Sequence, residues 1–116
     1  IRCRARSHHD PANPLASGGA LLSPTAIEYA AQAMALHGAL NVREGVIGRP
    51  GYIASARDVK LHVPRLDEVL GELIVEAENL AGNERQVVYR FAVRDEAGQP
   101  LVEGRVTVVL DTALPA

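Results

Sequence analysis

Two kinds of side chain that could exchange protons occur in the first third of the chain. They are an imidazole pair, His8 and His9, and a carboxylate, Glu28. Glu28 lies within residues 23–38, whose middle is almost entirely small or apolar, so we expect this helix to be buried. A carboxylate inside a buried helix is costly unless it is paired or used. A carboxylate and an imidazole brought together are a candidate acid–base pair.

Length and charge limit the classes of protein to consider. The chain has 116 residues, so we expect one domain over 1–116. Its formal net charge of −2 gives no electrostatic case for nucleic acid. No apolar run approaches about 18 residues, so we expect no membrane span. Cys3 is the only cysteine, which excludes an intrachain disulfide and a cysteine-based metal site and favours a reducing, cytoplasmic location.

Alternating apolar and polar residues predict strands in most of the chain. The expected strands cover residues 1–7, 52–63, 70–80, 85–95 and 101–110. In the first of them Cys3 faces the core, and in the later ones alternate valines and leucines do so. Residues 8–22 and 41–51 are rich in Gly and Pro and are expected to be loops.

One helix is expected over about 24–37. Ser23 is a good N-cap residue, Pro24 suits the first helical position, and Gly38 suits the C′ position. A helix that is apolar nearly all round must be surrounded, and a long twisted antiparallel sheet can wrap it. Such a sheet has open edges, and pairing of edges across a two-fold axis is a common remedy. We therefore expect an α+β fold and a homodimer.

Three segments resemble a known superfamily. They are the helix residues 26–33, the strand 52–60 with the following Val63 and Pro64, and the strand residues 102–106. The pattern, from about residue 1 to 110, is similar to the hot-dog fold. Within it the chain looks like the β-hydroxyacyl-acyl-carrier-protein dehydratases, and most like their predicted relatives in aryl-polyene-type clusters. An N-terminal helix and strand usual in that family are absent, so we expect residues upstream of Ile1.

The resemblance implies catalytic roles. It assigns the acid to Glu28 and the base to His9 by preference, with His8 as the competitor, the two residues coming from opposite subunits. The family's usual Gly-His-Phe-Pro is replaced by residues 7–11, Ser-His-His-Asp-Pro. Its Pro-Gly at the start of the helix, which supplies a backbone N–H to the thioester carbonyl, is Pro24-Thr25. The loop between the His and the Glu is several residues longer.

Further residues are expected around the substrate. Thr25, at the start of the helix, and Gln32, one turn after Glu28, are candidate substrate-binding residues, although Gln32 could also hold a loop carbonyl or Glu28. Arg57, with Lys60 and Arg65, could form a positive rim for an acidic carrier protein or for the phosphates of coenzyme A. A plain solvated face is the alternative for these cations. We expect no metal and no cofactor.

These residues suit the dehydration of a 3-hydroxyacyl thioester to a trans-2-enoyl thioester, in fatty-acid or polyketide-type biosynthesis. A neutral imidazole can remove the C2 proton, and a carboxyl group with a raised pKa can protonate the departing hydroxyl. Two alternatives stay open. One is an acyl thioesterase, and the other is a non-catalytic hot-dog subunit of a heterodimer or an acyl-binding module. The acyl chain length and the choice of carrier protein or coenzyme A stay open too.

Overall fold

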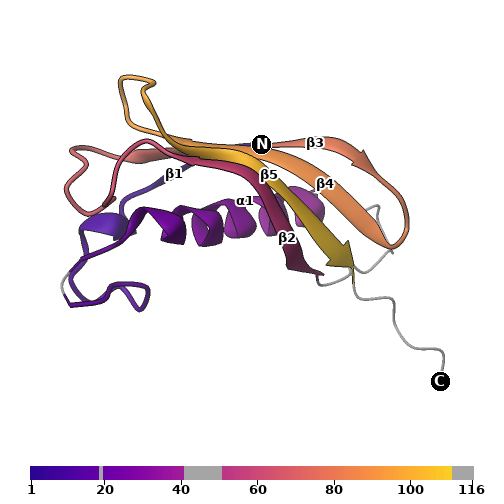
Figure 1. Ribbon diagram of the computed structural model, residues 1–116, viewed down its shortest axis with the longest axis horizontal. Helices are drawn as coiled ribbons and strands as arrows, with labels where there is room; N and C mark the ends of the chain where they lie inside the picture. The colour runs from indigo at the N-terminus through magenta and orange to yellow at the C-terminus, as the bar shows by residue number, and fades with distance from the viewer. Residues whose placement is uncertain (19, 41–50, 111–116) are drawn as a thin grey trace.

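A five-stranded antiparallel sheet and one long helix make up the computed structural model, which describes residues 1–18, 20–40 and 51–110 (Figure 1). The order of the strands in the sheet is β1-β3-β4-β5-β2. Their bounds are Arg2–Ala5 (β1), Gly51–Leu61 (β2), Leu73–Gly82 (β3), Gln86–Arg94 (β4) and Pro100–Leu110 (β5). The helix α1, Ala26–Leu40, lies along one face of this sheet (Figure 1).

One side of α1 is buried against the sheet. The buried residues of the helix recur every three or four positions and form one stripe: Ala26, Tyr29, Ala30, Ala33 and Met34. Alanines in this stripe let the helix backbone lie close to the strands.

The opposite side of α1 is open in the single chain. Glu28 and Gln32 are exposed there, and Leu36 is 48% exposed. The expectation of a helix buried all round, with a buried Glu28, is therefore wrong for the single chain. The sheet covers one side only, and the polar side chains lie on the other.

The inner face of the sheet is built from the alternate residues that the sequence predicts. The fully or nearly fully buried side chains on it are Leu73, Val75, Ala77, Tyr89, Phe91, Val93, Val102 and Val106. Gly104 leaves the space that Phe91 and β2 need. A Cβ at this position would lie 3.1 Å from Cε1 of Phe91 and 3.2 Å from Cα of Val59. Close packing of β2 and of the Phe91 ring against β5 therefore depends on a glycine at position 104.

Several boundaries differ from the sequence-based expectation. A 3₁₀ turn, Ser23–Thr25, precedes α1, and its N-cap is Leu22, without a side-chain capping hydrogen bond. Ser23 is thus part of the turn and not its cap, whereas Pro24 does occupy the first turn. The helix also continues through Gly38, because glycine disfavours a helix interior without forbidding it.

Strand ends shift by a few residues as well. The expected first strand ends at Ala5 and gives way to a 3₁₀ turn, Ser7–His9. The strand expected over 70–80 is Leu73–Gly82, and β2 ends at Leu61, before Pro64. Of the expected loop 41–51, residues 41–50 lie outside the described residues, and Gly51 begins β2.

Candidate functional site

The imidazole pair lies on the 3₁₀ turn that follows β1. His8 is buried, with 2% of its surface exposed, whereas His9 is exposed. The two rings lie 3.8 Å apart between centroids. His8 Nε2 is 3.1 Å and His9 Nε2 is 2.5 Å from the carbonyl oxygen of Val69. Since a carbonyl oxygen only accepts, each Nε2 carries the proton and each neutral ring keeps an unprotonated Nδ1.

His8 differs from His9 in its surroundings. Burial lowers the pKa of His8, and the neighbouring His9 lowers it further, so this ring is neutral at physiological pH. Its Nδ1 is buried and has no hydrogen-bond partner among the described residues. A buried acceptor without a partner is rare in folded proteins and is found at catalytic sites. His8 therefore combines a lowered pKa with a free basic nitrogen, two properties of a general base, whereas His9 is the ring exposed at the surface.

Hydrogen bonds within the segment between β2 and β3 hold the carbonyl of Val69 in place. Asp67 accepts the N–H of Leu21 at 2.9 Å and two hydrogen bonds from Arg65, at 3.1 and 2.6 Å. The bonds from Arg65 and then from Leu21 lower the pKa of Asp67 to about 2. The N–H of Val69 bonds to the oxygen of Leu66 at 3.0 Å. Asp67 thus joins the chain before α1 to the turn that orients both imidazoles.

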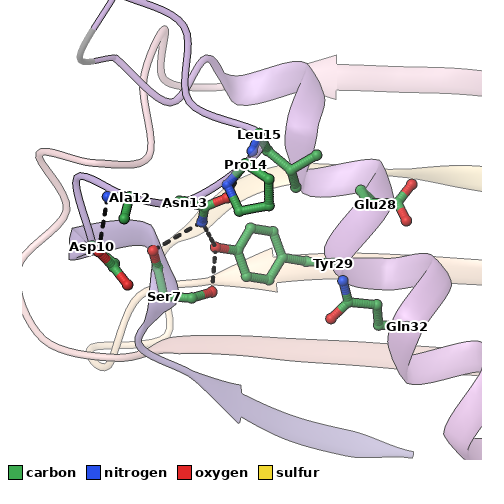
Figure 2. A pocket seen from close by; sticks show the side chains of 9 residues that line it. All are labelled: Ser7, Asp10, Ala12, Asn13, Pro14, Leu15, Glu28, Tyr29 and Gln32. Atoms are coloured by element: carbon green, nitrogen blue, oxygen red, sulfur yellow. Dashed lines mark hydrogen bonds between the residues drawn. The ribbon is translucent and has the colours of Figure 1, made fainter.

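The loop between the imidazoles and α1 is fastened to the helix by Tyr29. The hydroxyl of Tyr29 lies 2.7 Å from Oγ of Ser7 and accepts a hydrogen bond of 3.1 Å from Nδ2 of Asn13 (Figure 2). Asn13 Nδ2 also donates to the backbone oxygen of Ser7 at 2.9 Å. The ring of Tyr29 is buried, and its hydroxyl joins the loop to the helix.

A cavity of about 360 Å³ opens between this loop and α1. Its wall combines polar and apolar side chains: Ser7, Asp10, Ala12, Asn13, Pro14, Leu15, Glu28, Tyr29 and Gln32. Glu28 and Gln32 lie one turn apart on α1 and line the cavity from the helix side (Figure 2). Neither imidazole lines this cavity. The single chain thus presents the carboxylate and the imidazoles at different places.

Two of the expected substrate-binding residues lie elsewhere. The hydroxyl and the N–H of Thr25 both bond to the oxygen of Leu22, at 2.6 and 3.0 Å. Arg57 lies on β2, opposite Arg105 of β5. Arg65, which was expected to form a positive rim together with Arg57, is paired with Asp67 and Glu68. The structure therefore brings Glu28 and Gln32 together but leaves Thr25 and Arg57 outside the cavity.

Other features of the described residues carry less chemistry. No group of three or more His, Cys, Asp or Glu side chains that could hold a metal ion occurs in the described part of the chain. Among the same residues no helix is long and apolar enough to cross a membrane. Cys3 is half-buried and packs against the core, as its place in the strand predicts.

One long helix against a five-stranded antiparallel sheet in the order β1-β3-β4-β5-β2 is the architecture of the hot-dog fold. The chain belongs to the ApeP-like family, described as ApeP dehydratase, whose model matches residues 1–114. No curated protein matches the sequence.

Solved structures support the fold. The dehydratase heterocomplex ApeI:P from Xenorhabdus doucetiae matches with a TM-score of 0.78 and 21% identity, over 97% of this chain and 75% of that chain. The BH2602 protein from Bacillus halodurans, solved with CoA, matches with a TM-score of 0.66 and 13% identity, over 97% of this chain and 68% of that chain. The thioesterase HI1161 from Haemophilus influenzae matches with a TM-score of 0.59 and 16% identity, over 98% of this chain and 71% of that chain. The expected hot-dog fold is thereby confirmed.

Proposed function

We propose that this chain dehydrates 3-hydroxyacyl thioesters to trans-2-enoyl thioesters. The observation that carries the proposal is the position of Glu28. In a chain of a dehydratase family, its carboxylate lines a cavity on the open side of α1. A carboxyl group at this place can deliver a proton to a substrate that enters the cavity.

The base is proposed to be His8, with His9 as the competitor. The family resemblance favours His9, but His8 is the ring whose pKa is lowered by burial and whose Nδ1 has no partner among the described residues. A neutral, fixed imidazole with a free basic nitrogen is suited to remove a proton near pH 7. The hydrogen bond from Nε2 to Val69 holds this tautomer.

The complete site is proposed to form between two subunits. Neither imidazole lines the cavity of Glu28 in one chain, and the side of α1 that carries Glu28 is uncovered. A second subunit on this side would bring its own imidazole pair to Glu28 and exclude water. The partner is either a second copy of this chain or a different hot-dog chain, and the ApeI:P dehydratase heterocomplex is a precedent for the second arrangement.

The proposed reaction proceeds in two connected transfers. Nδ1 of His8 takes the proton from C2, and the electron pair of that bond forms the C2–C3 double bond. The C3–O bond breaks while the carboxyl group of Glu28 protonates the leaving hydroxyl, so that water departs. The second subunit would exclude water from the carboxyl group of Glu28 and from the substrate beside it. The amide of Gln32, one turn away, can hold the substrate or Glu28.

Analysis of the product by mass spectrometry tests the proposal. The full-length protein is given 3-hydroxyacyl thioesters on a carrier protein and on coenzyme A, the two carriers we propose for cytoplasmic fatty-acid or polyketide-type biosynthesis. We expect loss of one water, abolished in Glu28→Ala and retained in Glu84→Ala, which removes an exposed carboxylate in the turn between β3 and β4. Retention of full activity by both His8→Ala and Glu28→Ala would contradict the assignment of His8 as the base and Glu28 as the acid.

A thioesterase is the second candidate, because a protein named as a thioesterase shares this fold. The same carboxylate could direct water at the thioester carbonyl instead of protonating a hydroxyl. The product distinguishes the two reactions: a free acid and a thiol for the thioesterase, an enoyl thioester for the dehydratase. An unchanged substrate with every partner subunit would favour a non-catalytic role.

A further inference from the structure

Three arginines from three different strands lie side by side on the face of the sheet opposite α1. The strand register pairs Arg90 of β4 with Arg105 of β5, and Arg105 with Arg57 of β2. Directly opposed residues of antiparallel strands point to the same face, and Tyr89, which alternates with Arg90, is buried on the inner one. We call these three residues the arginine row.

The neighbouring row of the same face is arranged differently. Its members, in order across the sheet, are Arg2, Glu76, Ala92, Glu103 and Lys60. It contains two cations and two carboxylates, so its charges balance, and Glu76 also accepts a hydrogen bond of 2.9 Å from Nε of Arg94. The face thus contains a neutralised row next to a row that concentrates positive charge.

The arginine row is not neutralised within the described chain. All three guanidinium groups belong to exposed residues, and none forms an ion pair there. Glu78 lies opposite Arg90, and Asp58 follows Arg57 at a bulge with a φ of 53°, but neither carboxylate forms an ion pair either. Like charges directly opposite each other destabilise a sheet. A feature that destabilises the free chain indicates an anionic partner.

The shape of this surface indicates what kind of anion fits. Neighbouring strands are about 4.8 Å apart, so the row extends about 10 Å, which is wider than one phosphate group. The cavity described above lies on the other side of the sheet. Guanidinium groups bind carboxylates in a bidentate manner, and a flat row of them matches a series of carboxylates on a protein.

We propose that the arginine row is the docking surface for the acidic carrier protein that presents the acyl thioester. The identity of this partner rests on the proposed function. The row ends at β2, which is an edge strand, and α1 lies along the other face of the same sheet. A carrier bound at the row therefore lies beside the β2 edge of the sheet whose other face carries α1.

Reversal of the central charge tests the proposal. In Arg105→Glu, the new carboxylate faces Arg57 and Arg90, so the like-charge contacts become attractive and the melting temperature is expected to stay the same or rise. Affinity for the holo carrier protein without an acyl group, measured by calorimetry, should fall about tenfold or more, and its dependence on salt should weaken. A folded variant with weaker docking cannot be explained by unfolding.

Turnover separates docking from chemistry. For Arg105→Glu, kcat/KM should fall about tenfold with the carrier-bound thioester and stay within about twofold with the N-acetylcysteamine thioester, which has no protein to dock. The matched control is Arg85→Glu, which makes the same change of charge at an exposed residue outside the row. Wild-type affinity for the carrier in Arg105→Glu would overturn the proposal. If the wild type dehydrates neither thioester, the proposed function fails, and the calorimetric affinities still decide the docking.

Discussion

The two sides of α1 illustrate how one helix divides its residues between folding and chemistry. On the sheet side, alanines and Tyr29 are buried and in contact with the strands. On the open side, Glu28 and Gln32 border a cavity, and Leu36 is half-exposed. Substitutions on the sheet side should therefore change the free energy of unfolding, and those on the open side should change activity or assembly.

The sharpest test of this division is Glu28→Gln. The amide keeps the size of the side chain but cannot supply a proton, so the dehydration rate should fall by about 10²- to 10⁴-fold. Because Glu28 is exposed and forms no ion pair within the described chain, the free energy of unfolding should change by less than about 0.5 kcal/mol. Steady-state kinetics and urea denaturation of the same preparation measure both quantities. Loss of stability together with activity would contradict a purely chemical role.

Ala30→Leu enlarges a residue on the sheet side. Ala30 has none of its surface exposed, so three added carbon atoms must displace neighbours, and we expect a loss of about 1–3 kcal/mol of stability. Ala35→Leu makes the same change at an exposed position of α1 and should stay within about 0.5 kcal/mol. Chemical denaturation compares them. Equal effects of the two substitutions would mean that the two sides do not differ as described.

Tyr29→Phe keeps the buried ring and removes only the hydroxyl. The variant loses the contacts to Ser7 and Asn13, and we expect a loss of about 1 kcal/mol of stability. Faster hydrogen exchange of the loop 10–16 should accompany it. Tyr52→Phe, at a residue that is 64% exposed, is the control and should leave both unchanged. Unaltered exchange of the loop in Tyr29→Phe would show that the hydroxyl does not fasten it.

The sequence predicts the strands and their buried faces well, because alternation of side chains depends only on local periodicity. The alternation expected in the strand over 85–95 is seen in β4, where Tyr89, Phe91 and Val93 are buried on one face. The helix was also predicted, but its open side was not. Ala31, Ala35 and Leu36 are apolar too, so the sequence pattern does not reveal which side the sheet covers.

The sequence alone does not predict contacts between residues that are far apart along the chain. The arginine row depends on strand register, which places Arg57, Arg90 and Arg105 together although they are far apart along the chain. The acceptor for both imidazoles is a backbone carbonyl, that of Val69, and a main-chain atom leaves no signature in the residue type. The choice between His8 and His9 needed burial, which the sequence around two adjacent histidines does not give.

The smallest expected effect concerns Asp67, which joins the segment before α1 to the segment between β2 and β3. The pKa of Asp67 is lowered to about 2 from an unfolded value near 3.8, so its carboxylate stabilises the fold above about pH 4, and this contribution is lost as the pH falls toward 2. In Asp67→Asn the melting temperature should be slightly lower at neutral pH and should fall less between about pH 4 and pH 2 than in the wild type. Glu84→Gln, at an exposed turn residue, should keep the wild-type dependence. A parallel pH dependence of Asp67→Asn and the wild type would mean that the hydrogen bonds of this carboxylate to Arg65 and Leu21 do not stabilise the fold. The segment before α1 would then be held by backbone hydrogen bonds, from Leu66 to the oxygen of Leu21 and from Ser23 to the oxygen of Pro64.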